Sequence, residues 1–403
     1  MKVLQINSVC GVGSTGRIAA ELHACLKENG DEGWIAYGRG EAGGFADAIR
    51  IGGTADTYAH VALTRFFDRH GFGSRQATRR FLENVQALSP DLVHLHNLHG
   101  YYLHVGELFD WLRRSRLPVV WTLHDCWAFT GHCAYFDAAG CEKWQTGCGR
   151  CPQKKAYPAS FLMDRSAANY QDKKQIFTSL DTMALVAPSD WLAGLAGGSF
   201  LGKYPVRVIP NGIDLSVFKP TRGQVREKYG LGRDKLVLGV ASVWEQRKGL
   251  SDFVELSKRL EPGYRIVLVG VTERQKAALP PAILGIPRTD DVQELAALYT
   301  AADVFVNPSR EETMGMTTVE ALACGTPAVV YDATAVPEAV DDTCGIVVKA
   351  GDIDALCRAV SEADFPEEAC LRRAARYDKK ERFGEYMELY RRLVSSDEGG
   401  KRT

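Results

Sequence analysis

Short apolar runs alternate with longer amphipathic segments along the whole chain, a pattern that predicts alternating strands and helices. In the first half, apolar runs at Lys2–Asn7, Asp91–His96 and Val119–Leu123 each lead into glycine or polar residues. In the second half, Leu236–Val240 and Arg265–Val269 are almost continuously apolar, as expected of parallel strands covered on both faces. Two successive halves of this kind predict the α/β class, with two Rossmann-like, doubly wound domains facing a central cleft.

The two halves also predict where the domains begin and end. We expect an N-terminal Rossmann-like domain over residues 1–203, with a cysteine-rich insertion at about residues 126–158. A second Rossmann-like domain is expected over residues 204–382. Residues 383–403 are expected to form a helix that packs back on the first domain, followed by a polar tail that frays.

One polar stretch in the second half combines a loop with the start of a helix. Ser309–Gly315 follows an expected buried strand, and the next helix is expected to begin near Met316 and to stop at Gly325. Because glycine has no side chain, Gly315 lets a ligand approach the backbone N–H groups that open the helix. These groups and the helix dipole suit a phosphate, and they belong to Gly315, Met316 and Thr317.

Two glutamates flank this helix start, Glu312 in the loop and Glu320 in the helix. Both can accept hydrogen bonds from hydroxyl groups near a bound phosphate, although a solvated loop before a capped helix has the same pattern. The pair, followed by Ala-Leu-Ala-Cys-Gly-Thr-Pro, resembles the signature of retaining family 4 glycosyltransferases. This resemblance implies the GT-B fold and the transfer of a sugar from a UDP- or GDP-sugar to an acceptor hydroxyl, with retention. It assigns the sugar hydroxyls to Glu312 and the ribose to Glu320, in a second domain that binds the donor.

A cationic strand end is expected next to this helix. Arg247 and Lys248 follow the first strand of the second half, where a solvated turn is the plain alternative. With the helix-opening amides they can clamp a diphosphate and stabilise the leaving group without a metal. The resembled family usually has an arginine where this chain has Ser242, so more of the charge falls on these two residues. No residue is placed as a covalent nucleophile, which favours front-face displacement as the mechanism. Two residues at a later strand end, Arg288 and Thr289, suit the nucleobase.

A glycine-rich loop follows the first strand. Gly11, Gly13 and Gly16 match the G-x-G-x-x-G pattern of dinucleotide-binding proteins. The second strand ends in Gly38-Arg39 without an acidic residue, which disfavours NAD but leaves an NADP-dependent oxidoreductase as an alternative enzyme class. The resembled glycosyltransferases carry a glycine-rich loop here that lines the donor diphosphate, which assigns Gly13 and Gly16 to donor binding.

Several polar residues are expected at the strand ends of the first half, facing the acceptor side of a cleft. A lone histidine at a strand end is usually structural, but three converging imidazoles favour recognition of a polar ligand. The residues concerned are His96, Asn97, His99, His124 and Asp125. By the resemblance, His124 is the catalytic histidine that contacts the transferred sugar.

Five of the 11 cysteines lie between residues 126 and 151. In a reducing compartment such clustering favours a metal over disulfides. The spacing predicts one structural zinc with four thiolate ligands, while buried free cysteines and redox disulfides are the alternatives. The expected ligands are Cys133, Cys141, Cys148 and Cys151, with Cys126 and His132 as substitutes. No cofactor is expected for catalysis.

The stretch from His94 to Pro158 resembles a bacterial subgroup of group 1 glycosyltransferases associated with capsule and colanic-acid-type exopolysaccharide synthesis. The expected acceptor is therefore a glycan or a lipid-linked glycan. A non-enzymatic scaffold in polysaccharide assembly, docking through the cysteine-rich loop, is a further alternative. A scaffold would not need the four residues expected at the donor site, Arg247, Lys248, Glu312 and Glu320.

Composition and charge add limits on the partners and the compartment. A net charge of -1 excludes strong whole-protein attraction to nucleic acid. No apolar run approaches the ~20 residues needed to span a bilayer, and the first ten residues are expected to form a strand and no signal peptide, so we expect a cytoplasmic protein. The basic, aromatic stretch Tyr58–Leu88 can lie on an anionic membrane at its inner face, or can equally be a core-packed helix with solvated arginines.

Overall fold

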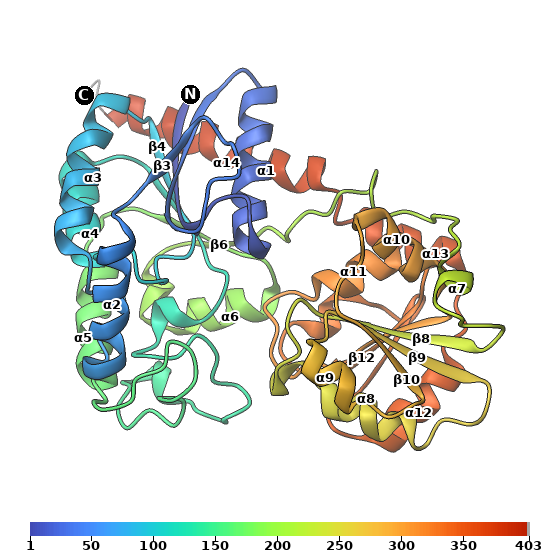
Figure 1. The fold of residues 1–403 in the computed structure, drawn as a ribbon. Helices are drawn as coiled ribbons and strands as arrows, with labels where there is room; N and C mark the ends of the chain where they lie inside the picture. The colour runs from blue at the N-terminus through green and yellow to red at the C-terminus, as the bar shows by residue number, and fades with distance from the viewer. Residues whose placement is uncertain (401–403) are drawn as a thin grey trace. The chain divides into compact units, whose positions relative to one another are not determined.

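The computed structural model describes residues 1–400, and the side chains of residues 1–396, as two compact units (Figure 1). The first unit contains Met1–Ile209 together with the chain from Phe383 onward, and the second contains Pro210–Arg382. The end of the expected C-terminal tail, residues 401–403, lies outside the described residues.

The first unit is built on a seven-stranded parallel sheet in the order β3-β2-β1-β4-β5-β6-β7. Its strands are β1 (Lys2–Val9), β2 (Glu32–Arg39), β3 (Ala48–Arg50), β4 (Leu92–Leu95), β5 (Val119–Thr122), β6 (Ala184–Ala187) and β7 (Val206–Val208). Its helices are α1 (Gly13–Glu28), α2 (Thr54–Phe67), α3 (Arg75–Leu88), α4 (Val105–Ser115), α5 (Ser166–Phe177) and α6 (Asp190–Gly198), together with most of the long α14 (Lys379–Gly400), whose first four residues belong to the second unit. Because β1 and β4 are neighbours, the order of the strands reverses between them.

The second unit repeats this architecture with a six-stranded parallel sheet in the order β10-β9-β8-β11-β12-β13. Its strands are β8 (Lys235–Val240), β9 (Tyr264–Val269), β10 (Ile283–Ile286), β11 (Val304–Asn307), β12 (Ala328–Asp332) and β13 (Gly345–Lys349). Its helices are α7 (Val225–Lys228), α8 (Leu250–Ser257), α9 (Glu273–Ala278), α10 (Val292–Ala301), α11 (Met316–Ala323), α12 (Ile353–Glu362) and α13 (Glu367–Ala375). The expectation of two Rossmann-like, doubly wound domains is confirmed.

The last helix, α14, returns to the first unit and packs on its sheet (Figure 1). Phe383, Tyr386 and Tyr390 are buried in one apolar cluster with residues of β1 and α1. The hydroxyl of Tyr390 also lies 2.6 Å from Nδ1 of His94, on β4. Apolar burial and this buried hydrogen bond therefore both hold the end of the chain on the first sheet.

The basic, aromatic stretch Tyr58–Leu88 forms two helices, α2 and α3, with a break at residues 68–74. Asp68 and Ser74 both have positive φ angles at the break, 52° and 54°. Phe72 and Phe81 are buried, so they cannot belong to a membrane-facing surface. None of the helices in residues 1–400 is both long and apolar enough to cross a bilayer.

Candidate functional site

Two loops of the second unit meet where the order of its strands reverses. They follow the neighbouring strands β8 and β11 and cover residues 241–249 and 308–315. Gly249 has a φ angle of +75°, and a Cβ atom there would lie 2.5 Å from the carbonyl oxygen of Pro308. The amide of Arg310 donates to the carbonyl oxygen of Arg247 across 2.8 Å. Residue 249 must therefore be glycine for the two loops to lie this close together.

The expected cationic residues contact the expected glutamate loop. The ammonium group of Lys248 forms an ion pair with the carboxylate of Glu312, and both side chains are mostly buried. Nη1 of Arg247 donates to the carbonyl oxygen of Glu311 at 3.0 Å, and its Nε lies 3.1 Å from Oε2 of Glu245. The structure thus brings together Arg247, Lys248 and Glu312 at the carboxyl end of the sheet, where ligands of open α/β sheets bind.

Helix α11 opens beside this ion pair, with Gly315 at its N-cap. The amide of Met316 donates to the carbonyl oxygen of Met314 at 2.9 Å, so it is already engaged. Thr317 stands at the second helical position, where an amide has no acceptor within the helix. Of the two helical residues expected to offer an amide to a phosphate, Thr317 is therefore better placed than Met316.

Glu320 lies one turn further along α11 and is fixed by α10. Its Oε2 accepts a hydrogen bond of 2.8 Å from the hydroxyl of the fully buried Tyr299. Burial and the neighbouring Glu320 raise the pKa of Tyr299 well above its ordinary value, so the phenol remains a donor. Arg288 and Thr289 follow β10, the edge strand of the same sheet, and Arg288 is exposed.

In the first unit, the glycine-rich loop leads from β1 directly into α1. Gly13 has a φ angle of +66° and open space around its Cβ position. A Cβ atom at Gly16 would lie 3.0 Å from the side chain of Val9, so this glycine lets the helix approach the strand. Asn97, after β4, is tied to the same region because its amide donates to Oδ1 of Asn7 at 3.3 Å. The strand ends of β1 and β4 are therefore joined as expected for a strand-order reversal.

Two of the expected histidines form a buried chain with a glutamine of β1. Nε2 of His96 lies 3.1 Å from Oε1 of Gln5, whose amide nitrogen donates to the carbonyl oxygen of Ala19. An amide oxygen only accepts, so His96 carries its proton on Nε2 and its Nδ1 accepts from Nε2 of His124, 3.1 Å away. Burial lowers the pKa of His124 to about 4, although the neighbouring Asp125 opposes this shift. His124 is therefore neutral at neutral pH.

His99 and Asp125 form a second pair, which includes a residue that the sequence pattern did not single out. Nε2 of His99 lies 2.7 Å from Oδ2 of Asp125, and its Nδ1 lies 2.9 Å from the hydroxyl of Tyr157. Burial of Asp125 opposes its ionisation, but His99 and the amide of Trp127 together hold the pKa of this carboxyl below its ordinary value. Tyr157 lies in the cysteine-rich loop, and no motif or spacing linked it to His99.

Two family models match this chain. Residues 15–217, just over half of the 403 residues, match the model described as Glycosyltransferase Family 4. The chain belongs to glycosyltransferase family 4. A second model, Glycosyl transferases group 1, matches residues 234–363 of this glycosyltransferase. The family expected from the Glu312 and Glu320 motif is therefore confirmed.

One relative and two solved structures match nearly the whole length of the glycosyltransferase. The putative colanic acid biosynthesis glycosyl transferase WcaC of Escherichia coli (strain K12) is 25% identical over 98% of this chain and 100% of its own. Sucrose-phosphate synthase from Thermosynechococcus elongatus has a TM-score of 0.72 at 18% identity and covers 98% of this chain and 99% of its own. HepE of Anabaena in complex with UDP and glucose has a TM-score of 0.66 at 15% identity, covering 96% and 99%. These structures share the fold, as the GT-B expectation requires.

Membership of this family decides between the alternatives left open by the sequence. The chain is a nucleotide-sugar-dependent glycosyltransferase, so neither an NADP-dependent oxidoreductase built on Gly11–Gly16 and Arg39 nor a non-catalytic scaffold describes it. The roles of individual side chains at the two strand-order reversals remain predictions. Each reversal nevertheless brings expected site residues of its own unit into contact, as described above for Lys248 with Glu312 and His96 with His124.

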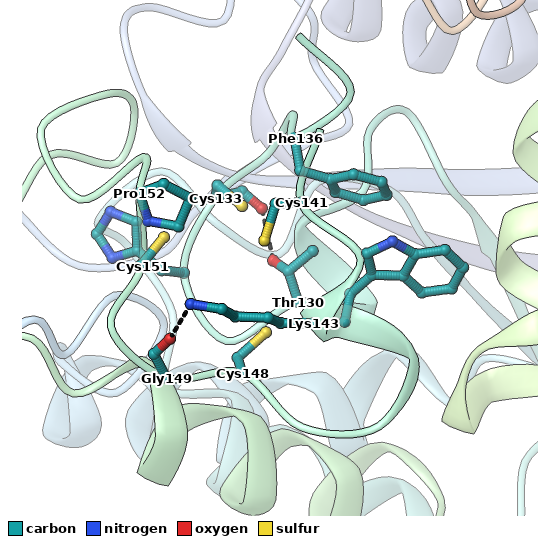
Figure 2. A pocket seen from close by; sticks show the side chains of 11 residues that line it. Thr130, Cys133, Phe136, Cys141, Lys143, Cys148, Gly149, Cys151 and Pro152 are labelled. Carbon is teal, nitrogen blue, oxygen red and sulfur yellow. Dashed lines mark hydrogen bonds between the residues drawn. The ribbon is translucent and has the colours of Figure 1, made fainter. Parts of the chain in front are cut away.

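The cysteine-rich loop of the glycosyltransferase forms a small, partly open pocket of its own (Figure 2). Its four expected metal ligands line one cavity together with His132, and they are Cys133, Cys141, Cys148 and Cys151. All of them are free thiols in the structure. Among residues 1–396, however, no three His, Cys, Asp or Glu side chains are already close enough together to hold a metal ion. The cysteines share a cavity, but the expected tetrahedral arrangement is not formed.

The buried histidines predict an acid-sensitive first unit. Burial lowers the pKa of His124 to about 4 and that of His60 to about 3, while both titrate near the ordinary value of 6.5 once unfolded. The unfolded chain then binds more protons than the native one, so stability is complete above about pH 6.5 and falls as the pH drops toward 4. At about 1.4 kcal/mol per pKa unit, we expect the free energy of unfolding to fall by several kcal/mol.

Pulse proteolysis in urea at pH 7.5 and pH 5.5, with fragments assigned by mass, measures this loss for each unit. The second unit contains no histidine, since all nine lie at or before His132, and serves as an internal control. Equal losses in both units would show that the buried imidazoles are not the cause.

Proposed function

We propose that this glycosyltransferase transfers a sugar from a UDP-sugar to a hydroxyl of a glycan or lipid-linked acceptor, with retention, during synthesis of an exported polysaccharide. The observation that carries the donor half is the convergence of Arg247, Lys248 and the N-terminus of α11 at the strand-order reversal of the second unit. UDP is favoured over GDP because HepE of Anabaena, a structural neighbour, is known in complex with UDP and with UDP-glucose. The polysaccharide assignment rests on the full-length relative WcaC.

The proposed chemistry depends on stabilising the departing diphosphate. Its negative charge grows in the transition state, and cations that are already in place lower the barrier most. Lys248 is paired with Glu312, so an incoming diphosphate can share the ammonium group while Glu312 turns to the hydroxyls of the sugar. The amide of Thr317 and the guanidinium of Arg247 supply the other donors, and the acceptor hydroxyl attacks from the face that the diphosphate leaves. No metal takes part in this scheme.

Residues of the first unit are proposed to serve the acceptor side. Neutral His124 can hydrogen-bond a sugar hydroxyl without adding charge, and His96 fixes its orientation. Asp125 is held as a carboxylate by His99 and can accept a hydrogen bond from an acceptor hydroxyl. Asn97 and the loop at Gly13 and Gly16 complete the polar lining of these strand ends.

A thermal-shift comparison of UDP-, GDP- and ADP-sugars tests the proposed donor. A ligand at 100 times its Kd stabilises the native state by about 2.7 kcal/mol, which is several degrees for a domain of this size. We expect a clear shift with UDP-sugars and UDP. A larger shift with GDP-sugars, or no shift with any nucleotide sugar, would contradict the assignment of the base.

The two glutamates of the signature predict different binding defects. Glu320→Gln is expected to weaken binding of UDP alone, because the ribose is present with or without the sugar. Glu312→Gln is expected to spare UDP and to weaken only the intact UDP-sugar. One charge-assisted hydrogen bond is worth about 1.5–3 kcal/mol, which corresponds to roughly 10–100-fold in Kd.

Calorimetry with UDP and with the UDP-sugar separates these roles. Tyr299→Phe is a useful companion variant, because it removes the hydroxyl that holds Glu320 but leaves the carboxylate in place. Equal losses of UDP affinity in both glutamate variants would contradict the division of roles.

A lipid-linked acceptor is supported by an exposed apolar surface near the proposed acceptor residues. This surface, the α2 patch, consists of the exposed side chains Phe66, Phe67, Phe161, Leu162 and Met163. The amides of Phe161 and Met163 donate to the carbonyl oxygens of Arg65 and Phe66, which places the strap 161–163 along the end of α2. The same loop carries Tyr157, the partner of His99.

Cations accompany the apolar side chains of the α2 patch. The guanidinium of Arg65 lies 5.2 Å from the ring centre of Phe161, and Lys154 donates to the carbonyl oxygen of Leu162. Arg69 and Lys155 are exposed on the same two segments. Exposed aromatic and aliphatic side chains next to lysine and arginine suit the interface of an anionic bilayer. We therefore propose peripheral binding at the inner face of the cytoplasmic membrane.

Serine substitutions at Phe161, Leu162 and Met163 together are expected to weaken binding to anionic vesicles by at least roughly tenfold. Burying each of the original side chains in the membrane would contribute up to about 1.5–3 kcal/mol of binding free energy, which serine does not provide. Co-sedimentation with vesicles containing phosphatidylglycerol measures the loss, and Val347→Ser, an exposed apolar position of the second unit, is the matched control. Unchanged vesicle binding, with a change from dimer to monomer, would instead make the α2 patch an interface between copies of the chain.

A further inference from the structure

We propose that the cysteine-rich loop binds one structural zinc ion through the thiolates of Cys133, Cys141, Cys148 and Cys151. The four residues line a single cavity of about 10 Å³ (Figure 2). A water molecule needs roughly 10–15 Å³ by the same measure, so the space between the side chains has room for a single small ion.

A backbone amide is directed at one of these sulfur atoms. The amide of Gly131 donates to Sγ of Cys148 at 3.2 Å. This contact depends on close packing, because a Cβ atom at Gly131 would lie 2.7 Å from Cβ of Cys148. An N–H group directed at a sulfur stabilises a thiolate more than a thiol, since the charged acceptor forms the stronger hydrogen bond.

A buried histidine on the same cavity has one nitrogen without a partner. Nδ1 of His132 lies 2.5 Å from Oδ1 of Asp68, and both side chains are completely buried. Nε2 of His132 has no hydrogen-bond partner among the described residues, although it is buried. The carboxylate of Asp68 can only accept, so Nδ1 carries the proton and the neutral ring leaves Nε2 as a lone pair. A buried lone pair without a donor is costly, so Nε2 indicates a cation bound in this cavity.

A buried lysine lies close to the cysteine-rich loop, and burial lowers its pKa to about 7. Lys173 is 1% exposed, and its Nζ donates to the carbonyl oxygens of Trp127 and Thr130 at 2.7 and 3.0 Å. Among residues 1–396, no carboxylate forms an ion pair with this ammonium group. Cys133 and Cys148 are among its nearest ionisable neighbours. A zinc ion with four thiolates has a net charge of −2, and a protonated Lys173 would offset one of these charges.

The length of the loop gives the metal a structural task. The chain from Thr130 to Arg165 contains only one short 3-10 helix, Lys143–Gln145, whereas loops of more than about 12–15 residues are uncommon in compact domains. Stacked rings of Phe136 and Trp144 pack one side of the loop. A bound zinc ion would fix the rest of the loop, because the energy of metal binding at such a site is folding energy for the loop.

Metal analysis of the full-length, untagged protein tests this proposal, with zinc supplied during expression. We expect about one zinc per chain and an X-ray absorption spectrum with four sulfur neighbours. All 11 thiols should react in denaturant containing a chelator. In the native protein, the four ligand thiols should be unreactive until the zinc is removed. Removal should also make residues 126–158 the first site of proteolysis.

Variants separate the metal ligands from the other cysteines. Cys148→Ser and Cys151→Ser should lose zinc, while Cys357→Ser, a partly exposed cysteine of the second unit, should retain it. If these ligand variants fail to fold, cobalt substitution in the unmodified protein gives the same information through the absorption of tetrahedral cobalt thiolates. Well under one zinc per chain, iron in its place, or a disulfide between two of the four cysteines would overturn the proposal. Three sulfur neighbours and one nitrogen would overturn the four-thiolate ligand set.

Discussion

Replacing Lys248 by alanine should lower kcat by roughly 10²–10³-fold, the usual loss when a group that stabilises developing charge is removed. Its ammonium group lies at the strand-order reversal of the second unit, paired with Glu312 and beside the start of α11. Arg247→Ala should have a comparable effect, since its guanidinium is held against the same loop through the carbonyl oxygen of Glu311. Initial rates with a saturating UDP-sugar measure both losses.

Lys258→Ala is the matched control for this prediction. Lys258 follows α8 in the same unit, but it is exposed and pairs only with Glu255 on the surface. Such pairs contribute little, so its rate should stay within about twofold of the unmodified enzyme. Near-normal kcat in both Lys248→Ala and Arg247→Ala would show that the diphosphate binds elsewhere.

Gly249→Ala should damage both the stability and the activity of the second unit. Its φ angle of +75° costs an alanine about 1–2 kcal/mol, and the new methyl group would lie 2.5 Å from the carbonyl oxygen of Pro308. The two loops must move apart, which displaces Lys248 relative to Glu312. A displacement of about 1 Å can cost roughly 10²-fold in rate, and we expect a loss of at least this size.

Gly230→Ala separates the two causes of this effect. Gly230 has a φ angle of +60°, but nothing lies within 4 Å of its Cβ position. It should therefore show the conformational cost as a small fall in Tm, with activity nearly unchanged. If the two variants lose activity equally, close approach of the loops at Gly249 is not what positions the site.

The sequence predicted the elements better than the contacts between them. Strands β1, β4, β5 and β8 were recognisable because strands covered on both faces leave apolar runs that end abruptly in glycine or polar residues. The residues at those ends could be assigned to a site because parallel strands place their carboxyl ends along one edge. This logic and the family signature together led to the prediction of Arg247, Lys248, Glu312 and Glu320 as donor-site residues.

Pairings over long separations could not be read from local patterns. Lys248 and Glu312 are 64 residues apart, as are Asp68 and His132, while His99 and Tyr157 are 58 apart. Such contacts depend on how loops pack after the sheets form, and no spacing in the sequence encodes them.

The amphipathic stretch at residues 58–88 shows the same limit. Its helical period was visible, but its break at left-handed Asp68 and Ser74 was not, because neither residue is a glycine. Its exposed apolar surface continues into Phe161–Met163 instead of Phe72 and Phe81, which are buried. The position of the strap 161–163 is set by backbone hydrogen bonds to α2, which only the fold reveals.

A crystal structure of the chain with UDP is the measurement that tests the donor site most directly. The account predicts that the diphosphate lies within hydrogen-bond distance of Nζ of Lys248 and of the Thr317 amide, with the ribose hydroxyls on Glu320. It also predicts that the Lys248 ammonium group is no longer paired with Glu312 alone but contacts the diphosphate as well. UDP bound at Gly11–Gly16 without contact to Lys248, or bound away from the carboxyl end of β8, would contradict it.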